Sequence, residues 1–383
     1  MFGANRYNVY FCILKTPSDM ENRLNYKIIY DRLRHDIESG AYAPGALLPT
    51  EAVLSQKYNV SRPTVARAYN MLQDDGLVTK KKGMGTVVNA VGAAASRPVY
   101  GLLLPGAGES EIFSIINDRL LTLSKEENFD CIWDGATAGS ANIRRELISG
   151  CCAGYIARKV DGVFFAPLER VGDAARLNRE ICDMLDSAGI PVVLIDRDIC
   201  DLPGRSGYDV VSLDNFSAGC IMAQHLIERN CDDIHFFYRP DSAASVKVRL
   251  AGVRETLHAA GLPLPDANIH CGDPEDPDAV AAIAIAKGRT GIICANDSTA
   301  AVLMSSLSGP GREISSDLLI CAFDDMKYSR HLRHPLTSFR QPCTEIADTC
   351  VELMQRRIAS PSAPPLSVLL EGTLIEREST IFK

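Results

Sequence analysis

The chain has 383 residues, of which 46% are hydrophobic and 23% charged, so its composition excludes a disordered protein and its length predicts two or three domains. Residues 20–89 hold ten Lys/Arg and seven Asp/Glu, a net charge of +3, and residues 1–19 add +1. Because the whole chain has a net charge of -8, residues 90–383 must carry -12. A small basic head on an acidic body predicts that only the head binds a polyanion, and the absence of an apolar run near ~20 residues excludes a membrane-spanning helix.

Residues 1–19 are predicted to be a disordered extension, or sequence upstream of a true start at Met20. Their apolar stretch, residues 9–14, is too short for a signal peptide and lacks a cleavage site. The thirteen cysteines are scattered without any Cys-x-x-Cys, which favours free thiols in a reducing cytoplasm over disulfides or zinc. We therefore expect a cytoplasmic protein without metal or cofactor.

The head, residues 20–89, is predicted to contain helices followed by a hairpin. A first helix over residues 25–40 ends at a glycine, and Thr50 caps a second. Ser61 caps a third helix, with Pro63 in its first turn. The apolar positions at helical spacing are Ile28, Ile29, Leu33, Ile37, Val53, Leu54, Tyr58, Val65, Ala68, Tyr69 and Leu72. Residues 77–88, LVTKKKGMGTVV, then alternate as two short strands, so the head is a winged helix-turn-helix of the α+β class.

The head resembles the GntR family of bacterial regulators. The matching stretches, in order, are PG at 44–45, LPTE at 48–51, VSRPTV at 60–65, GLV at 76–78 and GMGT at 83–86. The resemblance implies that the third helix enters the major groove of operator DNA and that the hairpin lies along the backbone or minor groove. The implied DNA-binding residues are Thr50, Glu51, Ser61, Arg62, Thr64, Arg67, Lys80, Lys81, Lys82, Gly83 and Gly85.

These residues have different expected roles. Arg62 and Thr64 would position the helix and contact bases, whereas Arg67 fits a solvated helix face equally well. The lysines would neutralise phosphates and add salt-dependent affinity without sequence choice. Ala52 and Ala66 stand where family members often carry Arg, so we expect a different operator sequence.

Residues 90–98 form a predicted linker, and the body, residues 99–383, alternates apolar strands with amphipathic helices. The predicted strands are 99–105, 129–133, 160–167, 190–196, 208–214, 233–239, 290–296, 318–325 and 336–342, and helices include 215–230, 245–261 and 298–307. Strands that are apolar throughout and followed by helices predict parallel sheets covered on both faces. So many strands favour two α/β lobes with a cleft between them.

Polar side chains follow several of these strands, where α/β sheets bind their ligands. The pairs are Asp196-Arg197, Asn296-Asp297, Asp324-Asp325 and Arg340-Gln341. Carboxylate, amide and guanidinium groups together suit a polyhydroxylated ligand, whose hydroxyls both donate and accept hydrogen bonds. Each of these residues could instead cap the helix that follows it.

The body resembles the lac-repressor and periplasmic sugar-binding superfamily. The matching stretches are residues 160–167, 190–198, 210–229, 248–262, 292–307, 320–325 and 336–358. The implied effector-binding residues are Phe113, Asp196, Arg197, Arg249, Asn296, Asp324 and Gln341, with Arg249 and Asp324 clamping the ligand from opposite sides. Glu111, in the first loop, either accepts sugar hydroxyls or faces water.

The pairing of both parts resembles the arabinose-repressor branch of the GntR family. It implies a homodimeric regulator, in family terms a repressor, whose affinity for operator DNA responds to a pentose or hexose, and not an enzyme. The alternatives are the same architecture with a purine or phosphosugar effector, a solute-binding protein of a transport system, and a pyridoxal-phosphate enzyme with a regulatory head.

Overall fold

The computed structural model describes residues 17–38, 40–81, 84–89, 97–105, 110–133, 141–201, 203–283, 288–307 and 317–381, with the backbone alone for 17–25, 38, 74 and 141–145. The chain divides into two compact units, Met1–Ser96 and Arg97–Lys383. Residues 1–16 of the predicted extension and 90–96 of the predicted linker lie outside the described residues. The first helix begins at Pro17, ahead of the predicted boundary at Met20.

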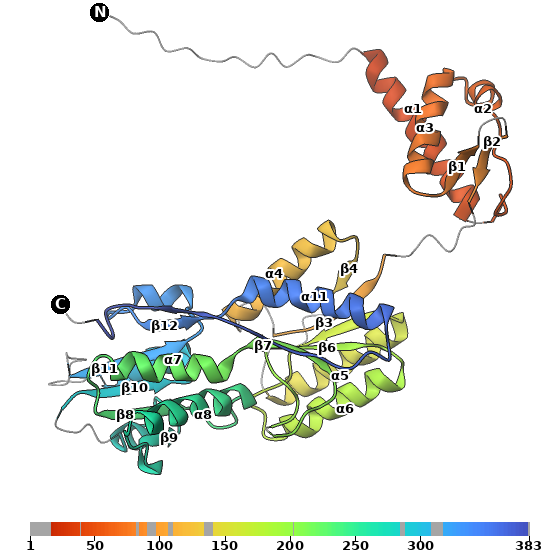
Figure 1. Ribbon diagram of the computed structural model, residues 1–383. Helices are drawn as coiled ribbons and strands as arrows, with labels where there is room; N and C mark the ends of the chain where they lie inside the picture. The colour runs from red at the N-terminus through yellow and green to blue at the C-terminus, as the bar shows by residue number, and fades with distance from the viewer. Residues whose placement is uncertain are drawn as a thin grey trace, which may run out of the picture. The chain divides into compact units, whose positions relative to one another are not determined.

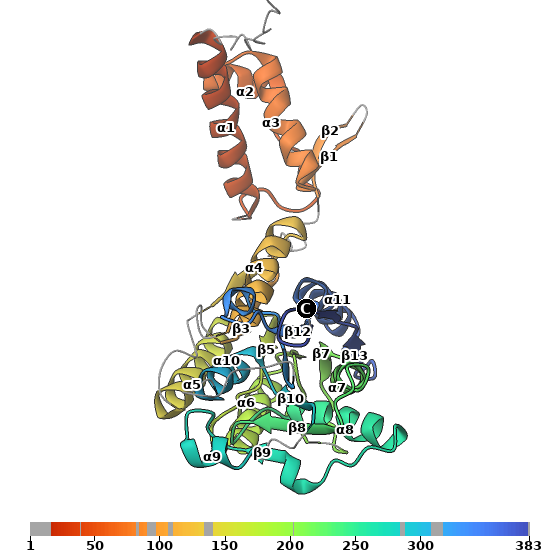
Figure 2. The same cartoon turned by 90° about the vertical axis from the view of Figure 1, so that its left-hand side faces the viewer.

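The head has the predicted winged helix-turn-helix fold (Figure 2). Its elements are α1 (Pro17–Glu38), α2 (Glu51–Tyr58), α3 (Arg62–Asp74) and an antiparallel hairpin of β1 (Val78–Lys81) and β2 (Gly85–Val88). The predicted stripe of α3 is confirmed, since Val65, Ala68, Tyr69 and Leu72 are at most 1% exposed. Ile28 and Val53 were expected on the apolar faces but are about half exposed, because the small core is already filled by neighbours such as Ile29 and Leu54.

The body consists of two α/β lobes. Lobe 1 has a parallel sheet in the order β13-β7-β6-β5-β3-β4, and lobe 2 a sheet in the order β14-β12-β11-β10-β8-β9, in which only β14 is antiparallel to its neighbour. The strands of lobe 1 are β3 (Val99–Leu103), β4 (Asp130–Ile132), β5 (Gly162–Phe165), β6 (Val192–Ile195), β7 (Asp209–Leu213) and β13 (Ser367–Leu370). Those of lobe 2 are β8 (Asp233–Tyr238), β9 (Ile269–Cys271), β10 (Thr290–Cys294), β11 (Leu318–Phe323), β12 (Thr337–Arg340) and β14 (Thr373–Ile375).

Helices cover both faces of each sheet (Figure 1). In lobe 1, α4 (Glu111–Glu126) and α11 (Cys343–Ala359) lie side by side on one face, opposite α5 (Ala141–Arg158) and α6 (Ala174–Ser187). In lobe 2, α7 (Asn215–Ile227) and α8 (Ala244–Ala259) cover one face, and α9 (Pro277–Ala281) and α10 (Asp297–Leu307) the other. Short 3-10 helices span Asp266–Asn268 (η1) and Lys327–His331 (η2).

The chain passes between the lobes after β7, after β12 and after β13, so the carboxyl ends of both sheets face the junction. Every predicted strand of the body is confirmed, whereas the short strands β9, β13 and β14 were not predicted. Within the described residues the cysteines are free thiols, and no helix is long and apolar enough to cross a membrane.

Candidate DNA-binding face and ligand cleft

α3 carries a polar face that points away from the core of the head. Arg62, Asn70 and Gln73 are exposed at helical spacing, opposite the buried stripe. Arg62 occupies the first turn, where side chains of a recognition helix contact DNA. Ala66, on the same face, is half-buried and offers no polar group. Asn70 and Gln73 were missed in the sequence, although amides are suited to contact base edges.

Thr64 does not belong to this face, which corrects its predicted role in contacting bases. Its side chain is buried, and its hydroxyl lies 2.7 Å from the Oγ of Ser61, the N-cap residue of α3. A short side chain at the start of a helix is within reach of the cap, so Thr64 supports the helix start. The guanidinium of Arg67 lies 4.2 Å from the ring centre of Tyr26, a cation–π contact that ties α3 to α1.

α2 begins with the two other predicted DNA contacts. The Thr50 hydroxyl accepts a hydrogen bond from the Val53 amide at 3.4 Å, which confirms Thr50 as the helix cap. Glu51 is the first residue of the helix, half-buried and close to the positive end of the helix dipole. Both residues therefore define where α2 starts.

The hairpin presents exposed lysines beside α3. Lys80 Nζ donates to Asn70 Oδ1 at 2.7 Å, so this lysine braces the hairpin against α3, and Lys81 is exposed at the end of β1. Gly85 has φ +103°, a backbone conformation that side chains rarely adopt. Lys82 and Gly83 lie outside the described residues.

In lobe 1 the cleft is lined by a buried ion-pair cluster after β5 and β6. Arg197, 8% exposed, lies with Nε 2.8 Å from Asp196 Oδ2 and with Nη1 2.9 Å from Glu169 Oε2. Burial alone would lower the pKa of Arg197, but the charges of Glu169 and Asp196 outweigh it and raise that pKa. Asp196 has φ +74°. The predicted pair Asp196-Arg197 is thus brought together with Glu169.

In lobe 2 the cleft is lined by Arg249, Asp324 and Gln341. Arg249 Nε donates to Asn215 Oδ1 at 2.8 Å and Nη1 to the Ala295 carbonyl at 2.7 Å, and its guanidinium lies 4.5 Å from the ring centre of Phe323. Gln341 Nε2 donates to Asp324 Oδ1 at 2.8 Å.

The position of Arg249 depends on a close approach of two helices. A Cβ added at Gly219 of α7 would lie 2.1 Å from the Arg249 carbonyl oxygen, and one added at Gly252 of α8 would lie 2.1 Å from the Phe216 carbonyl oxygen. Glycine is therefore required on both helices for α8 to lie where it does.

Asp324 is the electrostatic centre of the cleft. Burial raises its pKa to about 6, opposed by Arg249 and by the Gln341 hydrogen bond and reinforced by the charges of Asp196 and Glu169. Residues of both lobes thus act on one carboxyl. Its backbone φ of +111° is strained for a residue with a side chain, as often occurs at functional sites.

Asn296 and Asp297 follow β10 and start α10. Asn296 Oδ1 accepts from the Thr299 amide and the Ser298 hydroxyl, both at 2.9 Å, so Asn296 caps the helix, the alternative considered for each strand-end residue. Asp297 is fully buried and accepts from the Met326 amide and from the hydroxyls of Ser329 and Ser338. Burial and the Asp324 charge raise its pKa to about 7.

Phe113 does not face the cleft, which corrects its predicted contact with the ligand. It is 4% exposed and belongs to the core between α4 and the sheet, on the same stripe as Ile116 and Leu120. Glu111 lines a cavity between the lobes, and its Oε2 accepts from the Lys327 amide of lobe 2 at 2.9 Å.

Glu169, Asn215 and Tyr328 are cleft residues that the sequence analysis missed. Glu169 and Asn215 follow strands β5 and β7, so the same strand-end rule extended by a few residues identifies them. Tyr328, in η2, is 37% exposed, and its pKa is raised by burial and by Asp297, Asp324 and Glu111.

Cavities lie where the lobes meet. One of about 260 Å³ is lined by Asp196, Arg197, Asn215 and Ser245, among others. Another of about 560 Å³ is lined by Glu111, Asp324, Gln341 and Lys327, among others. The buried Oε1 of Gln341 has no hydrogen-bond partner among the described residues, which leaves an acceptor for a bound molecule.

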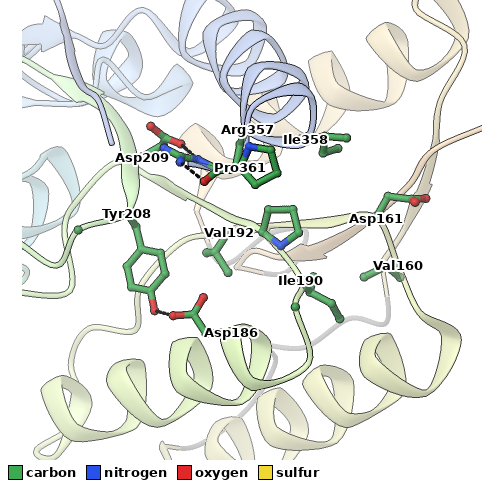
Figure 3. A pocket seen from close by; sticks show the side chains of 13 residues that line it. Val160, Asp161, Asp186, Ile190, Val192, Tyr208, Asp209, Arg357, Ile358 and Pro361 are labelled. Carbon is green, nitrogen blue, oxygen red and sulfur yellow. Dashed lines mark hydrogen bonds and ion pairs between the residues drawn. The ribbon is translucent and has the colours of Figure 1, made fainter. Parts of the chain in front are cut away.

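A further cavity of about 560 Å³ lies within lobe 1, at the starts of its strands and therefore at the sheet edge opposite the cleft (Figure 3). The Tyr208 hydroxyl donates to Asp186 at 2.5 Å, and Arg357 Nε to Asp209 at 2.8 Å. Asp161 accepts from the Val99 amide at 2.8 Å, which anchors β3. These hydrogen bonds join the strand starts to α6 and α11 and so stabilise the lobe.

Comparison with known proteins matches both parts of the chain. The family model "Bacterial regulatory proteins, gntR family" matches residues 25–88, and "Periplasmic binding protein-like domain" matches residues 223–380. The arabinose metabolism transcriptional repressor of Halalkalibacterium halodurans is 24% identical over 380 residues, covering 94% of this chain and 97% of that protein. The HTH-type transcriptional regulator CelR of Thermobifida fusca is 29% identical over 245 residues, 63% of this chain and 68% of CelR. A solved CelR–cellobiose complex has a TM-score of 0.61 at 21% identity, covering 87% of this chain and 100% of that chain.

Proposed function

Since the chain joins a GntR-type winged helix to a periplasmic binding protein-like domain, we propose that it is a transcriptional regulator whose affinity for operator DNA is changed by a small neutral sugar bound between the two lobes. The relative that matches nearly the full length of this chain is a transcriptional repressor, and the relative matched over 63% of it is a transcriptional regulator. Repression of a sugar-metabolism gene by a cytoplasmic homodimer is the corresponding role for this protein.

The acceptors at Asp324 and Gln341 carry the proposal. Asp324 is a half-buried carboxyl in the cleft, and the adjacent Gln341 Oε1 is buried without a hydrogen-bond donor among the described residues. A sugar hydroxyl supplies the missing donor, and a second hydroxyl can donate to the carboxylate. Satisfying a buried acceptor is worth roughly 1–3 kcal/mol, so these atoms favour a polyhydroxylated ligand over an apolar one.

The charges of the cleft favour a neutral ligand over a phosphosugar or a uronic acid. Arg197 is already paired with two carboxylates, and Arg249 donates to Asn215 and to a backbone carbonyl. The pKa of Asp324 is raised because its surroundings disfavour negative charge. An anionic ligand would add another negative charge beside Asp324, and both Arg197 and Arg249 already have partners. Lys327, Arg330 and Arg340 line the same cavity, so the charged analogues of the sugars test whether these cations bind an anion. A purine, the other alternative, also has N–H donors for these acceptors, but they lie in one plane, whereas a sugar offers hydroxyls around its ring that both donate and accept.

The first experiment is a thermal-melting screen of the purified chain. The probes are L-arabinose, D-ribose, D-galactose and cellobiose, each beside an acidic or phosphorylated analogue. A ligand at 100 times its Kd stabilises the folded body by ~2.7 kcal/mol. We expect a neutral sugar to raise Tm and its charged analogue to leave Tm unchanged. A shift with phosphosugars alone would contradict the proposed effector class.

DNA binding is tested separately by selecting operator sequences from genomic fragments and measuring fluorescence anisotropy. Arg62→Ala should weaken binding of the selected operator by at least tenfold, as expected for a residue that contacts bases or phosphates. The matched control is Arg32→Ala, which removes an exposed arginine of α1 outside the α3 face. Equal losses in both variants would mean that only net charge matters and would contradict the role of α3.

A further inference from the structure

One carboxylate of lobe 1 reaches across the cleft to lobe 2. Glu169 follows β5, and its Oε2 accepts from the amide of Ala243, the N-cap residue of α8, at 3.2 Å. The same oxygen lies 2.9 Å from Arg197 Nη1. Glu169 thus contacts a cleft arginine of its own lobe and the helix that carries the cleft arginine of the other lobe, Arg249.

The surroundings hold Glu169 in its ionised form. Burial by itself would raise its pKa, but the charges of Arg197 and Arg170 outweigh burial and lower it. A carboxylate at the start of a long helix also interacts favourably with the helix dipole. Hydrogen bonds to ionised groups are about twice as strong as neutral ones, so this contact is stronger than an ordinary surface contact.

Other contacts join the lobes without involving the Glu169 carboxylate. The Arg170 amide donates to the Asp241 carbonyl at 2.8 Å, beside Glu169. Away from it, Glu111 of α4 accepts from the Lys327 amide at 2.9 Å, and Lys327 Nζ lies 3.5 Å from the other oxygen of Glu111. The hydrogen bonds of the Arg170 and Lys327 amides therefore depend on contact between the lobes and not on the hydrogen bond from Ala243 to Glu169.

We propose that Glu169 is a positioning residue that couples the ligand cleft to lobe closure: it orients Arg197 towards the cleft and, across the junction, holds the N-terminus of α8. The inference rests on the proposed function for its role in signalling, since an effector that binds between the lobes gains from a closed arrangement. Loss of Glu169 leaves Arg197 with Asp196 alone and frees α8, so the lobes separate more often even without ligand.

The test is amide hydrogen exchange on the full chain without ligand or DNA, so that it does not depend on the identity of the effector. The variants are Glu169→Ala, which removes charge and acceptor, and Glu169→Gln, which keeps an acceptor oxygen for Ala243. The matched control is Glu180→Ala, which breaks an exposed ion pair with Arg176 on α6 of the same lobe. Exchange of β6 and β11 amides serves as the reference for general unfolding.

In Glu169→Ala we expect exchange to rise roughly tenfold at Ala243, as for loss of a hydrogen bond to a charged group. A rise is also expected at Arg170 and Lys327, with a smaller effect in Glu169→Gln and none in Glu180→Ala. A rise confined to Ala243 would reduce Glu169 to a local helix cap and overturn the coupling. Unchanged exchange at Ala243 in both Glu169 variants would overturn the contact itself. A screen without a sugar hit would refute the proposed effector and leave this result standing.

Discussion

Replacing Asp297 by Asn should remove most of a pH-dependent loss of stability in the body. Asp297 is fully buried, and burial together with the neighbouring Asp324 charge raises its pKa to about 7 from the ordinary 3.8 of an aspartate side chain. A carboxyl whose pKa is raised by folding binds its proton more tightly in the folded state. Its contribution to the free energy of unfolding is therefore largest at low pH and is lost as the pH rises from about 4 to above 7. Between pH 5 and 8.5 the loss amounts to about 3 kcal/mol, at ~1.36 kcal/mol per pH unit.

Asn at position 297 is neutral at every pH in this range. It is expected to destabilise the body near pH 5, because an amide cannot accept from Met326, Ser329 and Ser338 in the same way, and to lose much less stability than the wild type on going to pH 8.5. Urea unfolding followed by the fluorescence of Trp133, the only tryptophan and a residue of the body, measures this. Comparing the two proteins cancels other titrating groups. If the free energy of unfolding fell equally with pH in the wild type and in Asp297→Asn, the raised pKa of Asp297 would be refuted.

Three further predictions concern the cleft, the hairpin and the helix pair that positions Arg249. Asp324→Ala should abolish the melting shift caused by the effector while operator affinity without effector stays within about twofold, and loss of operator binding would instead make Asp324 structural. Lys81→Ala should weaken binding of all DNA sequences alike and lower the slope of log K against log salt by about 1, whereas a sequence-dependent loss would contradict a phosphate contact. Gly219→Ala should destabilise the body by at least ~2 kcal/mol in urea unfolding, because its Cβ would meet the Arg249 carbonyl at 2.1 Å. Its control, Gly150→Ala in α5, meets no atom within 4 Å and should be neutral or stabilising by up to ~1 kcal/mol.

The fold followed from the sequence where the signal was local. Apolar runs of strand length separated by amphipathic segments predicted every long strand of both lobes. The short strands β9, β13 and β14 escaped because each is only three or four residues long and none is buried throughout. No local pattern indicates that residues 367–370 pair with β7, because the strands β8 to β12 of lobe 2 lie between them in the sequence.

The site followed from topology more than from residue type. Since the carboxyl ends of parallel strands meet at one edge, the strand-end rule identified Asp196, Asp324 and Gln341. It missed Glu169 because the predicted strand was taken to end at the preceding proline. It could not show that Asn296 caps its own helix, because capping and ligand binding require the same side chain. Phe113 was assigned by resemblance although its spacing with Ile116 and Leu120 already indicated a core stripe.

The connectivity restricts how a bound ligand can alter DNA affinity. The head is linked to the start of β3, in lobe 1, where Asp161 anchors Val99. If lobe 2 closes on lobe 1, the attachment of the head within one chain is unchanged. In the proposed homodimer, by contrast, closure would change how the two copies of lobe 1 are placed and hence the spacing of two heads on a symmetric operator.

Two DNA duplexes of equal length therefore distinguish signalling between subunits from signalling within one chain. One carries the full selected operator, and the other carries a single half-site. We expect the effector to change affinity for the full operator by about 5–150-fold, the usual range of allosteric coupling, and to leave half-site affinity unchanged. By reciprocity, the full operator must change effector affinity by the same factor. An equal response on the half-site would mean that the body acts directly on its own head, and the dimer would no longer be needed to explain regulation.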